Sequence, residues 1–332
     1  MEPVRWGILS TARIGRIRVV PGLMKSPLCK VAAVASRDEA AAGAMAKEFG
    51  IPKAYGSYEA LLADPEIEAI YNPLPNHLHV PMTLAAASAG KHVLCEKPIA
   101  LTTEEAERLA EAASRVVIAE AFMVRHHPQW HRVRELIEAG AIGEARFVQV
   151  VFSYFNADPA NIRNNRDIGG GGLLDIGCYA VVAGRYLFGA EPLRAIALID
   201  RDSSFGVDRT ASALMDFGAG RQLTFTVSTQ GARHQSVQVF GTKGRIEIAV
   251  PFNAPADREA RIYVDDGSLP GGASARPIEL PAVDQYQLQG EAFSRAVRGV
   301  QPLAYGFDDA VQNMRILDAL KRSETSAAWE TI

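Results

Sequence analysis

The feature that most constrains the fold is the alternation of short apolar runs with helical stretches over the first 120 residues. The apolar runs are rich in β-branched residues and lack polar alternation, which is typical of parallel strands covered on both faces. Strands are expected at 4–10, 31–36, 69–72, 92–95 and 116–121, and helices at 38–49 and 103–114. This alternation predicts an α/β domain with a doubly wound parallel sheet over residues 1–122.

From residue 123 the pattern changes to longer strands with fewer helices. The strand expected at 144–155 has apolar residues on both faces, so we expect a helix on one face and another element on the other. Further strands are expected at 211–217, 222–228, 236–240 and 245–250, helices at 128–139, 172–187, 285–297 and 307–321, and a loop with one short strand at 254–281. Residues 123–332 are therefore predicted to form an α+β domain with a large, mostly antiparallel sheet.

Composition excludes several classes of function. Lys and Arg total 35 against 38 Asp and Glu, a net charge of −3, which argues against nucleic-acid binding because phosphate contacts need a basic surplus. No apolar run approaches the ~20 residues of a membrane span, and the first strand begins too early for a signal peptide. Cys29, Cys95 and Cys178 are isolated and odd in number, so buried thiols in the cytoplasm are expected.

The first expected strand runs into the turn Ser10-Thr11-Ala12-Arg13-Ile14-Gly15. Aligned with the dinucleotide fingerprint GxGxxG, this turn has serine, alanine and glycine at the three glycine positions, a weak match. Small residues there still let backbone N–H groups approach a pyrophosphate. The alternative is an ordinary turn between a strand and a helix.

The end of the second strand bears on the choice of cofactor. An NAD-selective enzyme places a carboxylate there, whereas this chain has Ser36 followed by Arg37, about 20 residues after the turn. A guanidinium can bind a 2′-phosphate with charge-assisted hydrogen bonds, which favours NADP. Asp38 is better explained as the N-cap of the next helix. A solvated surface charge is the alternative for Arg37.

The fifth strand ends at Glu96-Lys97-Pro98, where ligands bind in a doubly wound sheet. Lys97 would place a positive charge near a substrate oxygen. A second candidate is the helix that follows Gly169–Gly172, in which Asp175 and Tyr179 are four residues apart and so share a face. An ammonium group nearby would lower the pKa of Tyr179 and suit it to proton transfer. A core helix with a satisfied Tyr–Asp pair is the alternative.

Together these motifs carry a family resemblance: the Ser10–Gly15 turn, Leu74-Pro75-Asn76-His77-x-His79, Gly90-Lys91-His92-Val93, Glu96-Lys97-Pro98 and the glycine-led Asp175/Tyr179 helix. Over essentially the whole chain they resemble the family of glucose–fructose oxidoreductase, inositol dehydrogenase and dimeric dihydrodiol dehydrogenase. Many members have histidine at the position of Tyr179, and tyrosine there is similar to the glucose–fructose oxidoreductase and dihydrodiol dehydrogenase branch. The departure lies in the glycine fingerprint.

The resemblance implies an N-terminal Rossmann domain over residues 1–122 that binds NADP, and an open-faced sheet in a C-terminal domain over residues 123–332 that serves substrate binding and oligomerisation. Lys97 and Tyr179 would be catalytic, with Asp175 as the supporting carboxylate, and these three would bind substrate. Apart from the resemblance, Arg163 stands in a cluster with Asn164 and Arg166 just before the glycine run and could also bind substrate hydroxyls; a solvated loop charge is the alternative. NADP would be bound by Ser10, Thr11, Ala12, Arg13, Ile14, Ser36, Arg37, Leu74, Pro75, Asn76, His79, Glu96, Lys97 and Arg125. Contacts of His126 and Tyr286 with substrate are left open. No metal is expected, because His127 and His131 have ligand spacing without the HExxH glutamate.

The sequence therefore predicts an NADP-dependent oxidoreductase acting on a sugar or polyol. Three alternatives stay open: a dihydrodiol or carbonyl oxidoreductase, an aldose–aldose oxidoreductase that retains its NADP, and a non-catalytic NADP-binding regulator. Free exchange of NADP is expected, because three residues before the first strand are too few for a clamping arm. A homodimer or higher oligomer through the C-terminal sheet is expected, because a bare apolar sheet face is rare in soluble monomers.

Overall fold

The computed structural model describes all residues from Met1 to Ile332 and divides into two compact units. Unit 1 contains residues 1–123 and 284–314, and unit 2 contains residues 124–283 and 315–332. The expected boundary after residue 122 agrees with the end of the first segment, but residues 284–314 return to unit 1. The reason is packing: Phe293 lies 5.1 Å from Trp6 between ring centroids, and Ser294 accepts a hydrogen bond from the Trp6 indole at 3.4 Å.

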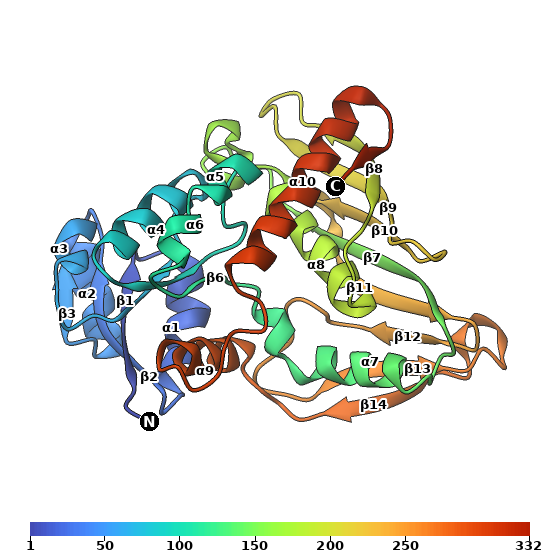
Figure 1. Cartoon of the computed structure of the whole chain (residues 1–332), viewed down its shortest axis with the longest axis horizontal. Helices are drawn as coiled ribbons and strands as arrows, with labels where there is room; N and C mark the ends of the chain where they lie inside the picture. Colours follow the sequence, from blue (N-terminus) through green and yellow to red (C-terminus); the bar gives the residue numbers. More distant parts are fainter. The chain divides into compact units, whose positions relative to one another are not determined.

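Unit 1 is built on a six-stranded parallel sheet in the order β3-β2-β1-β4-β5-β6 (Figure 1). Its strands are β1 (Val4–Leu9), β2 (Cys29–Ala35), β3 (Lys53–Tyr55), β4 (Ala69–Asn72), β5 (His92–Cys95) and β6 (Ile118–Glu120). Its helices are α1 (Val20–Met24), α2 (Glu39–Phe49), α3 (Tyr58–Leu62), α4 (His79–Ser88), α5 (Thr103–Glu107), α6 (Ala110–Ala113) and α9 (Gln285–Val297). The strand order reverses between β1 and β4, which makes the carboxyl ends of these two strands the expected ligand edge.

Unit 2 is built on a nine-stranded sheet in the order β14-β13-β12-β11-β7-β10-β9-β8-β15. Its strands are β7 (Ala145–Phe155), β8 (Arg194–Arg201), β9 (Asp208–Asp216), β10 (Gln222–Ser228), β11 (Gln230–Gly241), β12 (Arg245–Ile248), β13 (Ala260–Asp265), β14 (Arg276–Leu280) and β15 (Glu330–Thr331). Its helices are α7 (Pro128–Glu138), α8 (Cys178–Phe188) and the second half of α10 (Phe307–Ser326). Apart from the β7–β10 pair, neighbouring strands run antiparallel, as expected.

One face of this sheet is covered and the other is open. On the covered face, Leu223, Phe225 and Val227 are buried, and Gly184 of α8 lies so close that an added Cβ would be 2.8 Å from Leu223. On the open face Leu198 is 78% exposed and Phe155 71%. The covering helix expected on the 144–155 strand is therefore present, while no element of unit 2 buries the opposite face. None of the helices combines the length and apolarity needed to cross a bilayer.

Candidate active site

The turn after β1 has the backbone form that a phosphate-binding turn requires. Ser10 adopts a left-handed φ of +83°, the conformation for which the fingerprint's first glycine is used. Its amide donates to Ala35 O at 2.8 Å, and its hydroxyl accepts from the Ala12 amide at 3.2 Å. The helix that begins at Gly15 has no side-chain N-cap, so its first N–H groups can face an anion.

At the end of β2, Asp38 serves as the helix cap that the sequence predicts. Asp38 caps α2 by accepting from the Ala41 amide at 3.1 Å, and the Ser36 hydroxyl accepts from the Asp38 amide at 3.1 Å. Arg37 between them is exposed. A carboxylate committed to a helix cap and a guanidinium in solvent suit a 2′-phosphate better than a free ribose 2′-hydroxyl.

His79 holds two loops of unit 1 together. Its Nε2 lies 2.7 Å from Leu74 O and its Nδ1 lies 2.6 Å from Pro98 O, in the loops after β4 and β5. The ring is 1% exposed, and burial lowers its pKa to about 4. His79 therefore acts on the loop geometry around Lys97, which precedes a cis Pro98.

Glu96 and Lys97 end β5 with part of their side chains accessible. The Tyr71 hydroxyl donates to Glu96 Oε1 at 2.6 Å, and the Lys97 amide donates to Glu96 Oε2 at 3.2 Å. Tyr286 of α9 belongs to the same unit, and its pKa is raised by burial and by the charge of Glu96. Unit 1 thus brings the cofactor candidates from the ends of four strands, β1, β2, β4 and β5, to one edge of its sheet.

Unit 2 centres its candidates on a helix that starts as a π-helical turn, Leu173–Gly177, and continues as α8. Asp175 Oδ2 accepts a hydrogen bond from the Tyr154 hydroxyl at 2.6 Å and pairs with Arg163 Nε at 2.9 Å. Burial, followed by the charge of Asp175, raises the pKa of Tyr154, so its hydroxyl stays protonated and donates. The structure brings Asp175 and Arg163 together, and it adds Tyr154, which lies on the strand expected to be apolar on both faces.

Tyr179 lies one turn further along the same helix and is 7% exposed. Its ring packs against Phe252 and Phe152, with centroid distances of 5.3 Å and 6.0 Å. These contacts fix the direction of the phenol ring. An aromatic pocket of this kind holds a proton-transfer group in one orientation, which is what acid–base chemistry requires.

The segment before α7 contains several buried polar groups. Arg125 is 5% exposed, and its carbonyl oxygen lies 2.7 Å from His131 Nε2. His127 Nδ1 accepts from the Gln129 amide at 3.1 Å and serves as the N-cap of α7. Burial lowers the pKa values of His126 and His127 to about 4. The rings of His127 and His131 are therefore engaged in hydrogen bonds with backbone groups of this segment.

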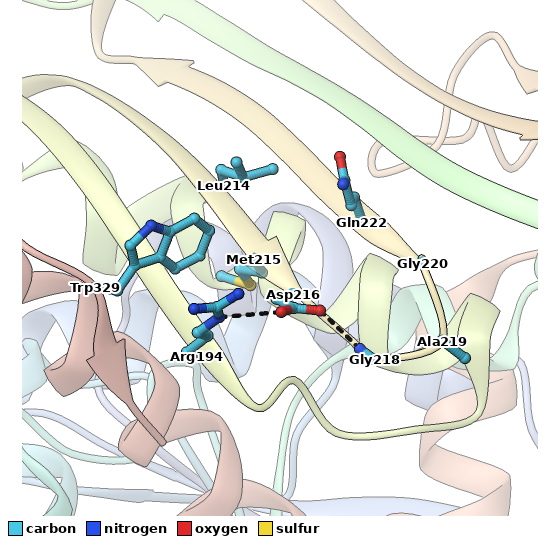
Figure 2. A pocket seen from close by; sticks show the side chains of 9 residues that line it. All are labelled: Arg194, Leu214, Met215, Asp216, Gly218, Ala219, Gly220, Gln222 and Trp329. Carbon is cyan, nitrogen blue, oxygen red and sulfur yellow. Dashed lines mark hydrogen bonds and ion pairs between the residues drawn. The ribbon is translucent and has the colours of Figure 1, made fainter.

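A shallow hollow of about 360 Å³ lies elsewhere on unit 2 (Figure 2). Arg194 pairs with Asp216 at 3.0 Å, and its guanidinium carbon lies 4.8 Å from the centroid of the Trp329 ring. None of the predicted site residues lines this hollow. Its two charged side chains, Arg194 and Asp216, are paired with each other.

These features define a class: an oxidoreductase with an N-terminal dinucleotide-binding fold and a C-terminal sheet domain. Comparison with known families agrees. Residues 4–120 match the oxidoreductase family with an NAD-binding Rossmann fold, and residues 130–247 match the GFO/IDH/MocA C-terminal domain. The chain belongs to the GFO/IDH/MocA family of oxidoreductases.

Individual relatives extend over the whole chain. It is 46% identical to an uncharacterized oxidoreductase, ORF334, of Rhizobium meliloti, over 100% of both chains. It is 39% identical to D-xylose 1-dehydrogenase (NADP(+)) 2 of Haloferax volcanii, over 98% of this chain and 99% of the other. The structure of KijD10, a 3-ketoreductase from Actinomadura kijaniata solved with NADP and TDP-benzene, superposes with a TM-score of 0.91 at 31% identity, covering 97% and 98% of the two chains.

Proposed function

We propose that the chain is an NADP-dependent sugar dehydrogenase, which moves a hydride between a carbinol carbon of a sugar and the nicotinamide. The observation that carries this proposal is the arrangement on the helix of unit 2. Asp175 is held by Tyr154 and Arg163 one turn before Tyr179. A fixed carboxylate next to a fixed phenol can accept a hydrogen bond from a sugar hydroxyl while the phenol exchanges a proton with the reacting oxygen.

The residues of unit 1 fit NADP. The Ser10–Gly15 turn would receive the pyrophosphate, Arg37 the 2′-phosphate, and Leu74–Asn76 and Glu96 would line the rest of the cofactor site. When bound, NADP supplies the hydride acceptor for oxidation of the alcohol. D-xylose 1-dehydrogenase (NADP(+)) 2 of Haloferax volcanii, at 39% identity, supports both the cofactor and an aldose substrate oxidised at C1.

The chain's own residues then divide the work on the substrate. Tyr179 takes the hydroxyl proton as the carbon loses its hydride, and Lys97 stabilises the phenolate with its positive charge. Asp175 and Arg163 hold neighbouring hydroxyl groups of the sugar. Proton transfer by a positioned group contributes about 10²–10⁴ in rate.

The test is a panel of aldoses, polyols, ketoses and dihydrodiols, incubated with the enzyme and NADP and followed by the absorbance of reduced cofactor. Oxidation of one or more aldoses at the highest kcat/KM supports the proposal. Preference for a dihydrodiol would move the assignment to diol oxidation. Protein that keeps stoichiometric NADP through a desalting column and reduces one sugar only while oxidising another would be an aldose–aldose oxidoreductase.

We also propose that two copies pair through the open face of the unit 2 sheet. Phe147 and Phe240 stack there with centroids 4.4 Å apart, and Leu198 is 78% exposed. Ser212, which pairs with Leu198 across the strands, and Thr226 lie on the same face and share a hydrogen bond of 2.9 Å. Light scattering of the wild type should give twice the chain mass, and Thr226→Arg should give the chain mass. A wild-type monomer at micromolar concentration would contradict this.

A further inference from the structure

Asp208 is a buried carboxylate at the first position of β9, 8% exposed, and sequence reasoning did not single it out. Its Oδ2 accepts a hydrogen bond from the Leu173 amide at 2.5 Å. Leu173 is the first residue of the π-helical turn that contains Asp175 and leads into α8 with Tyr179. A side chain from the sheet therefore caps the start of the helix that holds the candidate catalytic groups.

The glycine run before this helix is shaped around the same carboxylate. Gly171 has φ +115°, and a Cβ there would lie 2.0 Å from Asp208 Oδ1. A Cβ on Gly170 would lie 2.5 Å from Arg163 O, and the Gly171 amide donates to that carbonyl at 2.9 Å. The run is thus clamped between Asp208 on one side and the Arg163 loop on the other. Asp208 thus holds the start of the turn that contains Asp175, and the loop on the other side supplies the Arg163 side chain that pairs with Asp175.

This carboxylate lowers the stability of the fold at neutral pH. Burial raises the pKa of Asp208 to about 6, although the Leu173 and Asp208 amides and the charges of Arg201 and Lys321 oppose the shift. Arg201 is itself paired with Glu324 at 2.5 Å, which leaves less of its charge for Asp208. When the pKa of a carboxyl group is higher in the folded than in the unfolded state, the protein loses stability as the pH rises from the lower pKa to the higher one. Carboxylates that are buried in the ionised form at a cost in folding stability are typical of functional sites.

We propose that Asp208 is a positioning residue, which sets the placement of Asp175 and Tyr179 by holding the Leu173 amide and the Gly171 turn. It touches no substrate and acts through the helix. Its effect on catalysis rests on the proposed function, whereas its effect on the helix does not.

The test compares Asp208→Asn and Asp208→Ala with Asp265→Asn as the matched control. Asp265 is also a buried carboxylate of unit 2 that accepts a backbone hydrogen bond, from Gly267 at 2.9 Å. It lies on β13, with four strands between β13 and β9. The control therefore removes a buried carboxylate, here one paired with Arg245 at 3.1 Å, and one backbone hydrogen bond at a distance from the helix.

We expect Asp208→Ala to lower kcat about 100-fold, since small misplacements of reacting groups cost this much. Asp208→Asn keeps an acceptor oxygen and should recover to within about tenfold of wild type, with unchanged Kd for NADP. Its Tm at pH 7.5 should equal or exceed that of wild type, because a costly buried charge is gone. Asp265→Asn should lower Tm and leave kcat within about twofold of wild type.

Hydrogen exchange of the peptide covering 173–179 tests the helix without any reaction. Exchange should rise about tenfold in Asp208→Ala and stay at the wild-type rate in Asp265→Asn. If the wild type oxidises no substrate, the proposed function fails and the exchange rates still decide the role of Asp208. Wild-type exchange in both Asp208 variants, or a kcat that falls only as Tm falls, would overturn the proposal. If Asp208→Ala does not fold, Asp208→Asn decides alone.

Discussion

Replacing Tyr154 by phenylalanine removes one oxygen atom from the strand that faces the candidate catalytic helix. The lost hydroxyl donates to Asp175 Oδ2 at 2.6 Å, and hydrogen bonds to charged groups contribute about 1.5–3 kcal/mol. Arg163 still pairs with Asp175 at 2.9 Å, so the carboxylate is not left alone. We therefore expect the lower end, about 1.5–2 kcal/mol.

For a unit of this size, that loss lowers Tm by about 3–8 °C. Differential scanning calorimetry measures it, with Tyr263→Phe as the control, because Tyr263 is a half-buried tyrosine on a different strand of the same unit, β13. The Tyr154 pKa is raised by burial and by Asp175, so the loss should be the same between pH 7 and pH 9. Asp175 also becomes less fixed, so KM for sugar should rise while Kd for NADP does not. A Tm equal to that of Tyr263→Phe would refute the reasoning.

Three further predictions concern the cofactor site and pH. Arg37→Ala should weaken NADP binding about ten- to 100-fold and NAD binding less than twofold, measured by titration calorimetry, and equal losses would contradict the 2′-phosphate role. Gly15→Ala should leave Tm and NADP affinity at or above the wild-type values, because the added Cβ would lie 3.7 Å from Tyr71, an ordinary contact distance. A large loss of Tm in calorimetry, or of NADP affinity in titration calorimetry, would show that this position needs glycine. Burial lowers the pKa values of His79, His126 and His127 to about 4 in the fold, so their contribution to stability is complete above pH 6.5 and is lost toward pH 4, by about 4 kcal/mol per pH unit for the three groups together. Asp208 offsets about a third of this loss below pH 6. Urea denaturation at pH 7, 6 and 5 measures the loss, and a flat profile would contradict it.

The sequence predicts buried strands better than edge strands. The bounds expected at 69–72, 92–95 and 222–228 agree with β4, β5 and β10, which are interior strands with steady apolar content. The stretch 254–281 was expected to hold one short strand but contains β13 and β14, which pair at the sheet edge. Each of these strands has one face in solvent and the segment contains many Pro, Gly and Asp residues, so the alternation of apolar and polar residues is hard to recognise in the sequence. The strands β3 and β15, which are edge strands of three and two residues, were also missed, as was β8, in which only one residue is buried.

Long-range partners explain what was missed in the site. Asp175, Arg163 and Tyr179 carry local signals, namely a glycine run, a charge cluster and helical spacing. Tyr154 alternates with apolar residues along β7, so its hydroxyl could not be assigned to Asp175 from the sequence. Asp208 lies 35 residues from Leu173 and has no motif of its own. Its hydrogen bond with the Leu173 amide depends on the sheet, which places β9 next to the start of the helix.

The central claim is that Tyr179 transfers the proton during NADP-linked oxidation of a sugar. Tyr179→Phe removes only the hydroxyl and keeps the ring that packs against Phe252 and Phe152. The most direct measurement is kcat of this variant on the best aldose of the panel, beside its Kd for NADP. The account predicts a loss of at least about 100-fold in kcat with Kd within twofold of wild type. A variant that keeps more than about a tenth of the wild-type kcat would contradict it.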